Sequence, residues 1–205
     1  MEYRKNDIVT LEIVDCGTDG EGIGKADGFT VFVKDAVIGD TVTAKIMKAK
    51  KNYGYGRLME ILKPSPYRVD PICPSARQCG GCQLQAVSYE EQKAFKEKKL
   101  RGHLERIGGF KELPMEPLIG MDEPYHYRNK AQFPVGRNKE GRIVTGFYAG
   151  RTHAIIENRD CALGIPQNKE VLDRVIAHME KYNIAPYDEM TGKGLVRHIF
   201  VRYGF

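Results

Sequence analysis

Apolar and polar residues alternate in short runs over roughly the first sixty positions. The runs at 9–13, 29–34 and 42–46 each repeat with a period of two, which is typical of a strand with one buried face. A glycine-rich stretch at 16–28 separates the first two runs and reads as a turn, and YGRLMEIL forms the last run. Short strands at this spacing predict a small β-barrel, followed by a stiff linker that begins at Pro64.

The pattern becomes helical at 88–107. SYEE at its start is a capping box, with Ser88 as the N-cap and Glu91 three residues later. Lysines and arginines cover most of the remaining surface of this helix. Its apolar stripe consists of Phe95, Leu100, Leu104 and Ile107.

Strands and a second helix are expected in the rest of the chain. The runs 131–135 and 142–148 read as strands on either side of the turn GRNKEGR, and 195–205 reads as a further strand. Pro166 begins a helix, with Leu172, Val175, Ile176 and Met179 on one face. We therefore predict a barrel over 1–63 and an α+β domain over 64–205.

Composition narrows the class of protein. No apolar run approaches the roughly 20 residues of a membrane helix, and MEYRKNDIV has no secretory leader pattern, so we expect a cytoplasmic protein without a membrane partner. An odd number of cysteines, five, argues against a disulfide framework. The net charge of +5 suits a polyanionic partner without establishing one.

Three of the five cysteines lie within CPSARQCGGCQ. The spacing Cys73-x5-Cys79-x2-Cys82 puts three soft thiolate ligands on one loop, and the glycines between the last two allow tight folding around an inorganic group. Three thiolates need a fourth partner. Cys161 in NRDCALG is the better candidate, because Cys16 belongs to the barrel.

Four interpretations of this loop compete. A structural zinc site usually has a second Cys-x2-Cys pair or histidines at ligand spacing, and neither is found here. A redox dithiol needs a βαβ frame that the pattern does not show. Buried cysteines without a ligand do not account for three in one Gly/Pro loop. An iron–sulfur cluster fits the residues best.

A basic stretch with interleaved tyrosines, TVTAKIMKAKKNYGYGR, is the strongest signal outside the cysteines. Cations neutralise phosphates and tyrosine rings stack on unpaired bases, so the stretch indicates RNA binding. A solvated hairpin with tyrosines packed at its base is the alternative. The candidate residues are Lys45, Lys48, Lys50, Lys51, Tyr53, Tyr55 and Arg57.

Several of these motifs together resemble the bacterial 23S rRNA (uracil-C5)-methyltransferase family. CPSARQCGGCQLQ with SYEEQKAFKEKKL is similar to its iron–sulfur segment, GTDGEGIGKADGFTVFV to its TRAM domain, and YRNKAQFPV and NRDCAL to its central domain. The resemblance implies an OB-like five-stranded β-barrel followed by an α+β iron–sulfur domain, a fold class that is mainly β plus α+β. It also implies RNA contact by the group Arg128, Lys130 and Gln132, and a [4Fe–4S] cluster on Cys73, Cys79, Cys82 and Cys161.

The family continues into a domain that binds S-adenosylmethionine (SAM) and carries the catalytic cysteine. We expect this domain to be absent here, so that the chain binds RNA, with no obligate protein partner, and does not methylate by itself. The resemblance implies formation of 5-methyluridine in 23S rRNA by the parent enzyme. The alternatives are a tRNA substrate, a stand-alone RNA-binding iron–sulfur or zinc protein, and an electron carrier or redox sensor.

Overall fold

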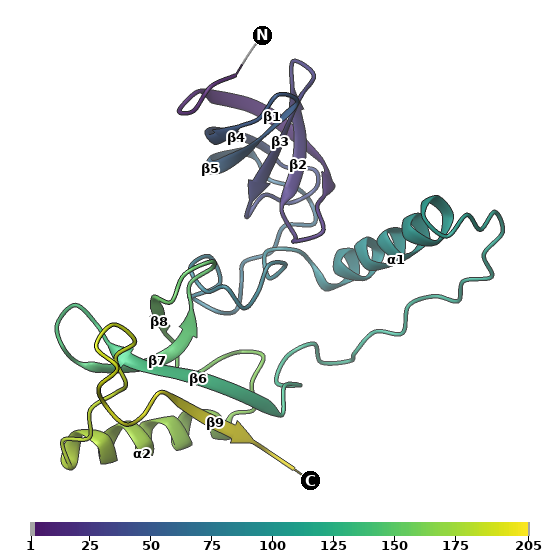
Figure 1. Cartoon of the computed structure of the whole chain (residues 1–205). Helices are drawn as coiled ribbons and strands as arrows, with labels where there is room; N and C mark the ends of the chain where they lie inside the picture. Colours follow the sequence, from purple (N-terminus) through teal and green to yellow (C-terminus); the bar gives the residue numbers. More distant parts are fainter. Residues whose placement is uncertain (1–2, 205) are drawn as a thin grey trace. The chain divides into compact units, whose positions relative to one another are not determined.

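The computed structural model describes residues 3–204 and divides into two compact units (Figure 1). Unit 1 comprises Met1–Pro71 and Gln83–Gly120, and unit 2 comprises Ile72–Cys82 and Met121–Phe205. The loop that carries three of the cysteines therefore belongs to unit 2, although segments of unit 1 precede and follow it along the chain.

Unit 1 contains a closed barrel with the strand order β1-β2-β3-β5-β4. β3 and β5 pair in parallel, whereas the other neighbouring pairs are antiparallel. Valine, leucine and isoleucine side chains at alternate positions fill the interior, which confirms the barrel predicted from the period of two. The strands are β1 (Ile8–Cys16), β2 (Gly22–Ala26), β3 (Phe29–Lys34), β4 (Thr41–Ala49) and β5 (Tyr53–Lys63).

The prediction of a turn over 16–28 was wrong for its second half, because Gly22–Ala26 is strand β2. β2 carries glycine where an inward strand residue would carry an apolar side chain, so the pattern concealed it. At Gly24 an added Cβ would lie 2.4 Å from both Leu11 Cδ1 and the Glu12 carbonyl oxygen. The glycine therefore permits a close approach to β1, whose register shifts between Ile13 and Asp15.

Asp40, which is fully buried, attaches the linker to the barrel. Its carboxylate accepts hydrogen bonds from the backbone N–H of Val37 at 2.7 Å and of Ser65 at 2.8 Å, and it forms an ion pair with Arg68. Arg68 also donates to the Asp35 carbonyl oxygen at 2.8 Å. These contacts join the segment up to Pro71 to the barrel within unit 1.

Helix α1 (Tyr89–Arg106) also belongs to unit 1, and its N-cap is Ser88 as predicted. The Ser88 hydroxyl accepts a hydrogen bond from the Glu91 N–H at 3.4 Å. The apolar stripe does not form a buried face, however, because Leu100 is 51% and Ile107 81% exposed. Polar contacts hold the helix instead, among them an ion pair of 2.8 Å between Lys98 and Asp15 of β1.

Unit 2 is an antiparallel sheet with the order β8-β7-β6-β9 (Figure 1). Residues 130–137, 143–148 and 198–202 confirm three predicted strands, whereas β8 was not predicted, because three residues are too short to show a period. The strands are β6 (Lys130–Arg137), β7 (Ile143–Tyr148), β8 (Ile155–Glu157) and β9 (His198–Arg202).

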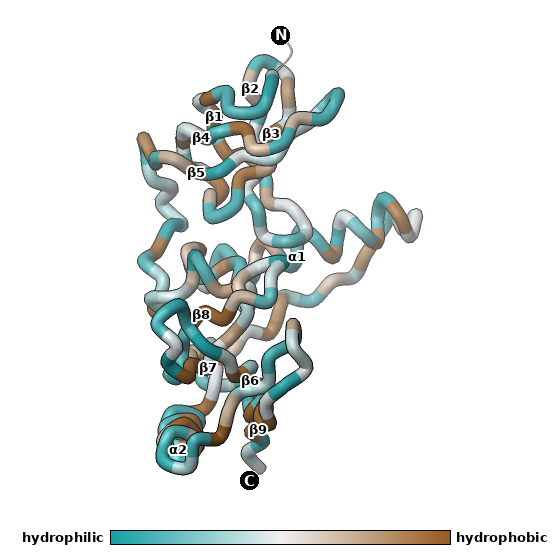
Figure 2. The backbone as a smooth tube through the Cα atoms, turned by 60° about the vertical axis from the view of Figure 1, so that its left-hand side comes forward, coloured by the Kyte–Doolittle hydropathy of each residue, from teal (hydrophilic) through white to brown (hydrophobic). Residues whose placement is uncertain are grey.

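Helix α2 (Gln167–Lys181) follows Pro166, as predicted, and covers one face of this sheet. Leu172, Ile176 and Met179 are buried against a cluster that includes Phe133 of the sheet. Figure 2 shows the amphipathic pattern, with brown and teal positions alternating along α2. Neither α1 nor α2, the helices described here, is long and apolar enough to cross a membrane.

Candidate nucleic-acid interface and cysteine site

The outward face of the barrel collects the predicted aromatic and basic residues of β5. Gly54, Gly56 and Leu58 point inward, so the intervening Tyr53, Tyr55 and Arg57 point outward and are exposed. The small inward residues matter here, since an added Cβ on Gly56 would meet Val31 at 3.0 Å and Ala44 at 3.1 Å. The sequence GYG thus lets β5 lie close to the core while it presents its rings to solvent.

A register shift in β4 brings a further lysine onto this face. Strict alternation would put Lys48 on the same side as the buried Ile46. The pairing with β5 shifts between these two residues, so that Lys48 stands opposite the outward Tyr55. Lys45 stands opposite Arg57 on the same strand pair. The shift thus assembles cations from both strands around the tyrosine.

Three aromatic rings lie together at the centre of this face. Phe32 of β3 pairs with Tyr55 in the parallel ladder, and their ring centroids are 5.6 Å apart. Tyr53 completes the group at 5.9 Å from Phe32 and 5.8 Å from Tyr55, edge-on to both. Sequence reasoning did not select Phe32. Its alternation with the buried Val31 and Val33 was the signal that it faces outward.

Lys50 and Lys51 lie in the tight β4–β5 turn, next to the rings. The turn is closed by the Lys50 N–H, which donates to the Tyr53 carbonyl oxygen at 2.8 Å. Both lysine side chains are exposed. Within residues 3–204, no carboxylate pairs with these two lysines or with Lys45, Lys48 and Arg57. The turn therefore offers its charges to an external anion.

The second predicted group, Arg128, Lys130 and Gln132, lies in unit 2, at and just before the start of β6. Lys130 and Gln132 are exposed on β6, opposite Arg202 and Phe200 of β9 respectively. The Lys130 ammonium lies 5.3 Å from the centroid of the Phe200 ring. Arg128 lies just before β6 and is half-buried, and its backbone N–H donates to the Leu163 carbonyl oxygen at 2.9 Å. All three residues remain interface candidates in unit 2.

Several basic residues of α1 are engaged within unit 1. Lys98 pairs with Asp15, and Lys99 donates to the Thr18 carbonyl oxygen at 3.2 Å. Lys93 pairs with Glu90 at 2.8 Å. These contacts favour the structural interpretation of the helix charges over RNA contact.

The cysteine loop of unit 2 is anchored to the end of β7. Cys79 forms an isolated bridge with Ala149, and the Gly80 N–H donates to the Tyr148 carbonyl oxygen at 2.9 Å. An added Cβ on Gly80 would lie 3.0 Å from that oxygen and 3.1 Å from the backbone of Gly150. Gly80 thus favours this close backbone approach, beside a cysteine that is itself buried.

Two of the other predicted ligands act electrostatically on Cys79. Burial raises the pKa of the Cys79 thiol, and negative charge on Cys161 and Cys73 raises it further, while the Gly81 N–H and Arg128 oppose the rise. Two N–H groups point at sulfur: Gly81 donates to Cys79 Sγ at 3.3 Å and Asn158 Nδ2 to Cys73 Sγ at 3.5 Å. Such N–H···S contacts are typical of thiolates that hold a metal or cluster.

The donor chemistry therefore fits a thiolate-bound group, and the loop and Cys161 share one unit. Among the described residues, however, no group of three or more His, Cys, Asp or Glu side chains is already arranged to hold a metal ion. The metal site thus stays a prediction, carried by the kind of donors and their neighbourhood.

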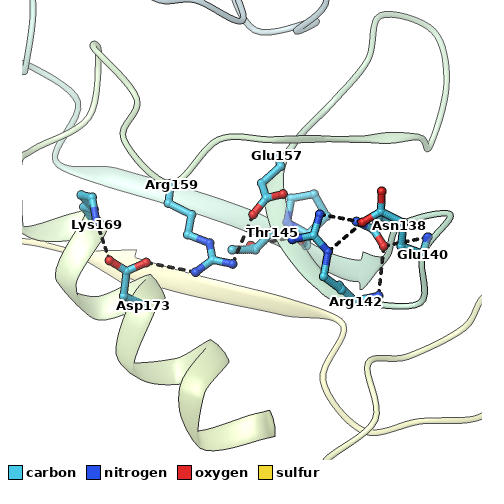
Figure 3. A network of polar contacts seen from close by, with 9 residues as sticks. Asn138, Glu140, Arg142, Thr145, Glu157, Arg159, Lys169 and Asp173 are labelled. Carbon is cyan, nitrogen blue, oxygen red and sulfur yellow. Dashed lines mark hydrogen bonds and ion pairs between the residues drawn. The ribbon is translucent and has the colours of Figure 1, made fainter.

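Arg159 fixes the loop that carries Cys161 (Figure 3). Its guanidinium donates to Asp173 of α2 at 3.1 Å and to Glu157 of β8 at 3.2 Å, and Asp173 also pairs with Lys169. The turn after it is closed by the Gly164 N–H, which donates to the Cys161 carbonyl oxygen at 2.8 Å. Sequence reasoning missed Arg159 and Asn158, although both lie within three residues of Cys161.

Cys16 has a different environment. It lies at the end of β1 in unit 1, where burial, helped by the carboxylates of Glu21 and Asp15, raises its pKa to about 11. A thiol with so high a pKa is almost entirely protonated at neutral pH and is a poor ligand or nucleophile. This agrees with its exclusion from the predicted ligand set.

Comparison with known proteins supports the assignment of the barrel. Residues 4–59 match the TRAM domain family. The crystal structure of a tRNA (uracil-54, C5)-methyltransferase of Pyrococcus abyssi, in complex with S-adenosyl-L-homocysteine, matches 95% of this chain and 42% of its own, with a TM-score of 0.68 and 24% identity. That likeness shows a shared fold.

Curated relatives align with nearly the whole chain. A protein of Halalkalibacterium halodurans that bears the name uncharacterized RNA methyltransferase is 43% identical over 201 residues, 98% of this chain and 44% of the relative. One of the same name from Clostridium tetani is 44% identical over 205 residues, 100% of this chain and 44% of the relative. The chain spans less than half the length of these relatives. It thus contains a TRAM domain, and its relatives bear the name of RNA methyltransferases.

Proposed function

We propose that this chain is the RNA-holding part of a SAM-dependent RNA uridine-C5 methyltransferase that acts on 23S rRNA. The observation that carries the proposal is the outward barrel face, where three aromatic rings lie among cations without acidic partners in the described residues. Rings take up unpaired bases by stacking, and the cations neutralise phosphates. The names of the curated relatives support the reaction class.

We assign methyl transfer to the part of the relatives that has no counterpart in these 205 residues. That part is more than half the length of each relative. The chain alone is therefore expected to bind RNA without methylating it. The second candidate substrate is tRNA, which the name of the solved protein of similar fold favours. Competition between 23S rRNA fragments and tRNA for the chain distinguishes the two.

Within this function, Cys73, Cys79, Cys82 and Cys161 hold a [4Fe–4S] cluster. Four thiolates leave no open position on the irons, so the role assigned to the group is structural. It would link the loop at 73–82 to the β8–α2 connection, beside the strand β6 that bears Lys130 and Gln132. A zinc ion on the same thiolates is the alternative.

Reversing two turn charges tests the barrel interface. Lys50→Glu with Lys51→Glu is expected to weaken binding of single-stranded RNA about tenfold or more at 0.1 M salt. The slope of the logarithm of the binding constant against the logarithm of the salt concentration should become shallower by about 0.7 for each lost phosphate contact. Fluorescence anisotropy at several salt concentrations measures both. The double variant Lys96→Glu with Lys111→Glu has the same net charge and should retain the parent slope. An unchanged slope in the turn variant would refute the interface.

Removing one ring tests stacking separately from charge. Tyr55→Ala is expected to weaken the same RNA roughly tenfold, since a base stacked on an aromatic side chain contributes about 1–3 kcal/mol. Tyr55→Phe keeps the ring and should bind like the parent. Tyr182→Ala removes the exposed C-cap tyrosine that follows α2 and is the control outside the barrel. Equal affinity of Tyr55→Ala and Tyr55→Phe would exclude stacking at this position.

A further inference from the structure

Unit 2 contains a cleft of about 390 Å³, and its lining includes no residue of the barrel and no cysteine. Its walls come from 135–137, from Tyr148 and 153–155, from the loop 186–190 and from Arg197. Small-molecule sites have volumes of roughly 300–1,000 Å³ and combine apolar walls with a few convergent polar groups. The cleft is therefore large enough for one nucleotide.

Two tyrosines present aromatic surface in this cleft. Tyr148 stacks with His153 at a centroid distance of 5.1 Å and an angle of 23° between the rings. Tyr187 lies under Arg197, whose guanidinium carbon is 5.5 Å from the ring centroid. Aromatic rings and guanidinium planes are the groups on which proteins stack splayed-out bases.

The acidic groups of the cleft already have partners. The two oxygens of Glu189 contact His153 Nδ1 at 2.7 Å and Arg197 at 2.9 Å, and these hydrogen bonds lower the pKa of Glu189. Asp188 accepts the N–H groups of Met190 at 2.8 Å and Thr191 at 3.3 Å. Glu189 therefore orients Arg197, which keeps further N–H groups for an anion.

We propose that this cleft binds one unpaired nucleotide of RNA, with its base on a tyrosine ring and its phosphate against Arg197. The proposal rests on the proposed function, because it names a place where unit 2 holds the RNA. Arg137 at the rim supplies a second cation.

The test uses the whole chain labelled with nitrogen-15, and uridine 5′-monophosphate as the probe. Backbone amides of 135–137, 153–155 and 187–190 are expected to shift in a saturable manner, and uridine or inorganic phosphate alone should bind more weakly. Arg197→Gln should weaken the probe about tenfold, because it removes a charge-assisted hydrogen bond to phosphate. Arg174→Gln is the matched control: Arg174 also pairs with a glutamate, Glu170, but lies on α2 outside the cleft.

Two results would overturn the inference: amide shifts that are confined to the barrel, or equal affinity of Arg197→Gln and the parent for the probe. Amide signals that do not shift on adding the probe show that the variant is folded. The double variant Lys50→Glu with Lys51→Glu tests the two sites separately. It should lose affinity for long RNA and should bind the probe in the cleft as tightly as the parent does. If the parent binds the probe in the cleft but no RNA of any length, the RNA assignment of both sites fails.

Discussion

Cys161→Ser is expected to leave the anaerobically purified chain with less than about a tenth of the iron and labile sulfide of the parent. Serine offers a hard oxygen in place of a soft thiolate, and a cluster that loses one of four ligands exposes an iron to solvent. Cys79→Ser should lose as much. Iron, sulfide and zinc analysis with visible absorption measures the result.

Cys16→Ser is the matched control, because Cys16 lies half-buried at the end of β1 in unit 1 and the pKa of its thiol is raised to about 11. It should keep the full iron and sulfide content. Full retention in Cys161→Ser would mean that another residue is the fourth ligand. If the parent contains one zinc and no labile sulfide, the site is a zinc site on the same loop and not a cluster.

Asp40→Ala is expected to lower the free energy of unfolding of unit 1 by about 3–5 kcal/mol, the usual cost of removing one partner of a buried ion pair. It leaves Arg68 without its carboxylate and two buried N–H groups, those of Val37 and Ser65, without an acceptor. Urea denaturation followed by circular dichroism measures the change. Asp70→Ala removes an exposed carboxylate a short distance along the linker and should be neutral.

The same residue predicts a pH dependence. Burial alone would raise the pKa of Asp40, but hydrogen bonds from Arg68 and from two backbone amides outweigh it and lower the pKa. A lowered pKa means that the stabilisation is complete above the unfolded value of about 3.9 and is lost as the pH falls through the folded pKa. The difference in the free energy of unfolding between the parent and Asp40→Asn should therefore be large at pH 7 and small in acid. A gap that is constant between pH 3 and 7 would contradict this.

The regular elements could be predicted wherever an apolar side chain marks each period. Val9, Leu11 and Ile13 identify β1, and Leu172, Ile176 and Met179 identify the buried face of α2. β2 could not be predicted, because glycines stand at its inward positions and only the close approach of β1 explains them. The attachment of the linker to the barrel could not be predicted either, because the ion pair between Asp40 and Arg68 joins residues 28 positions apart.

The candidate site was visible in part. Clustered cysteines and a lysine run with tyrosines are local signals, so spacing alone identified them. Phe32 and Arg159 depend on distant neighbours, the first through the parallel pairing of β3 with β5 and the second through α2. Neither contact can be inferred from the positions of these residues in the sequence.

The interruption of unit 1 by the cysteine loop has a consequence for biosynthesis. Cys73, Cys79 and Cys82 leave the ribosome roughly 80 residues before Cys161, which is roughly 4–16 s at a synthesis rate of about 5–20 residues per second. During this interval the barrel strands are already complete, whereas the sheet that supports the loop through Tyr148 and Ala149 is not. If these thiols and Cys161 hold the proposed cluster, it is expected to be loaded only after β7 and the loop that carries Cys161 have been synthesised.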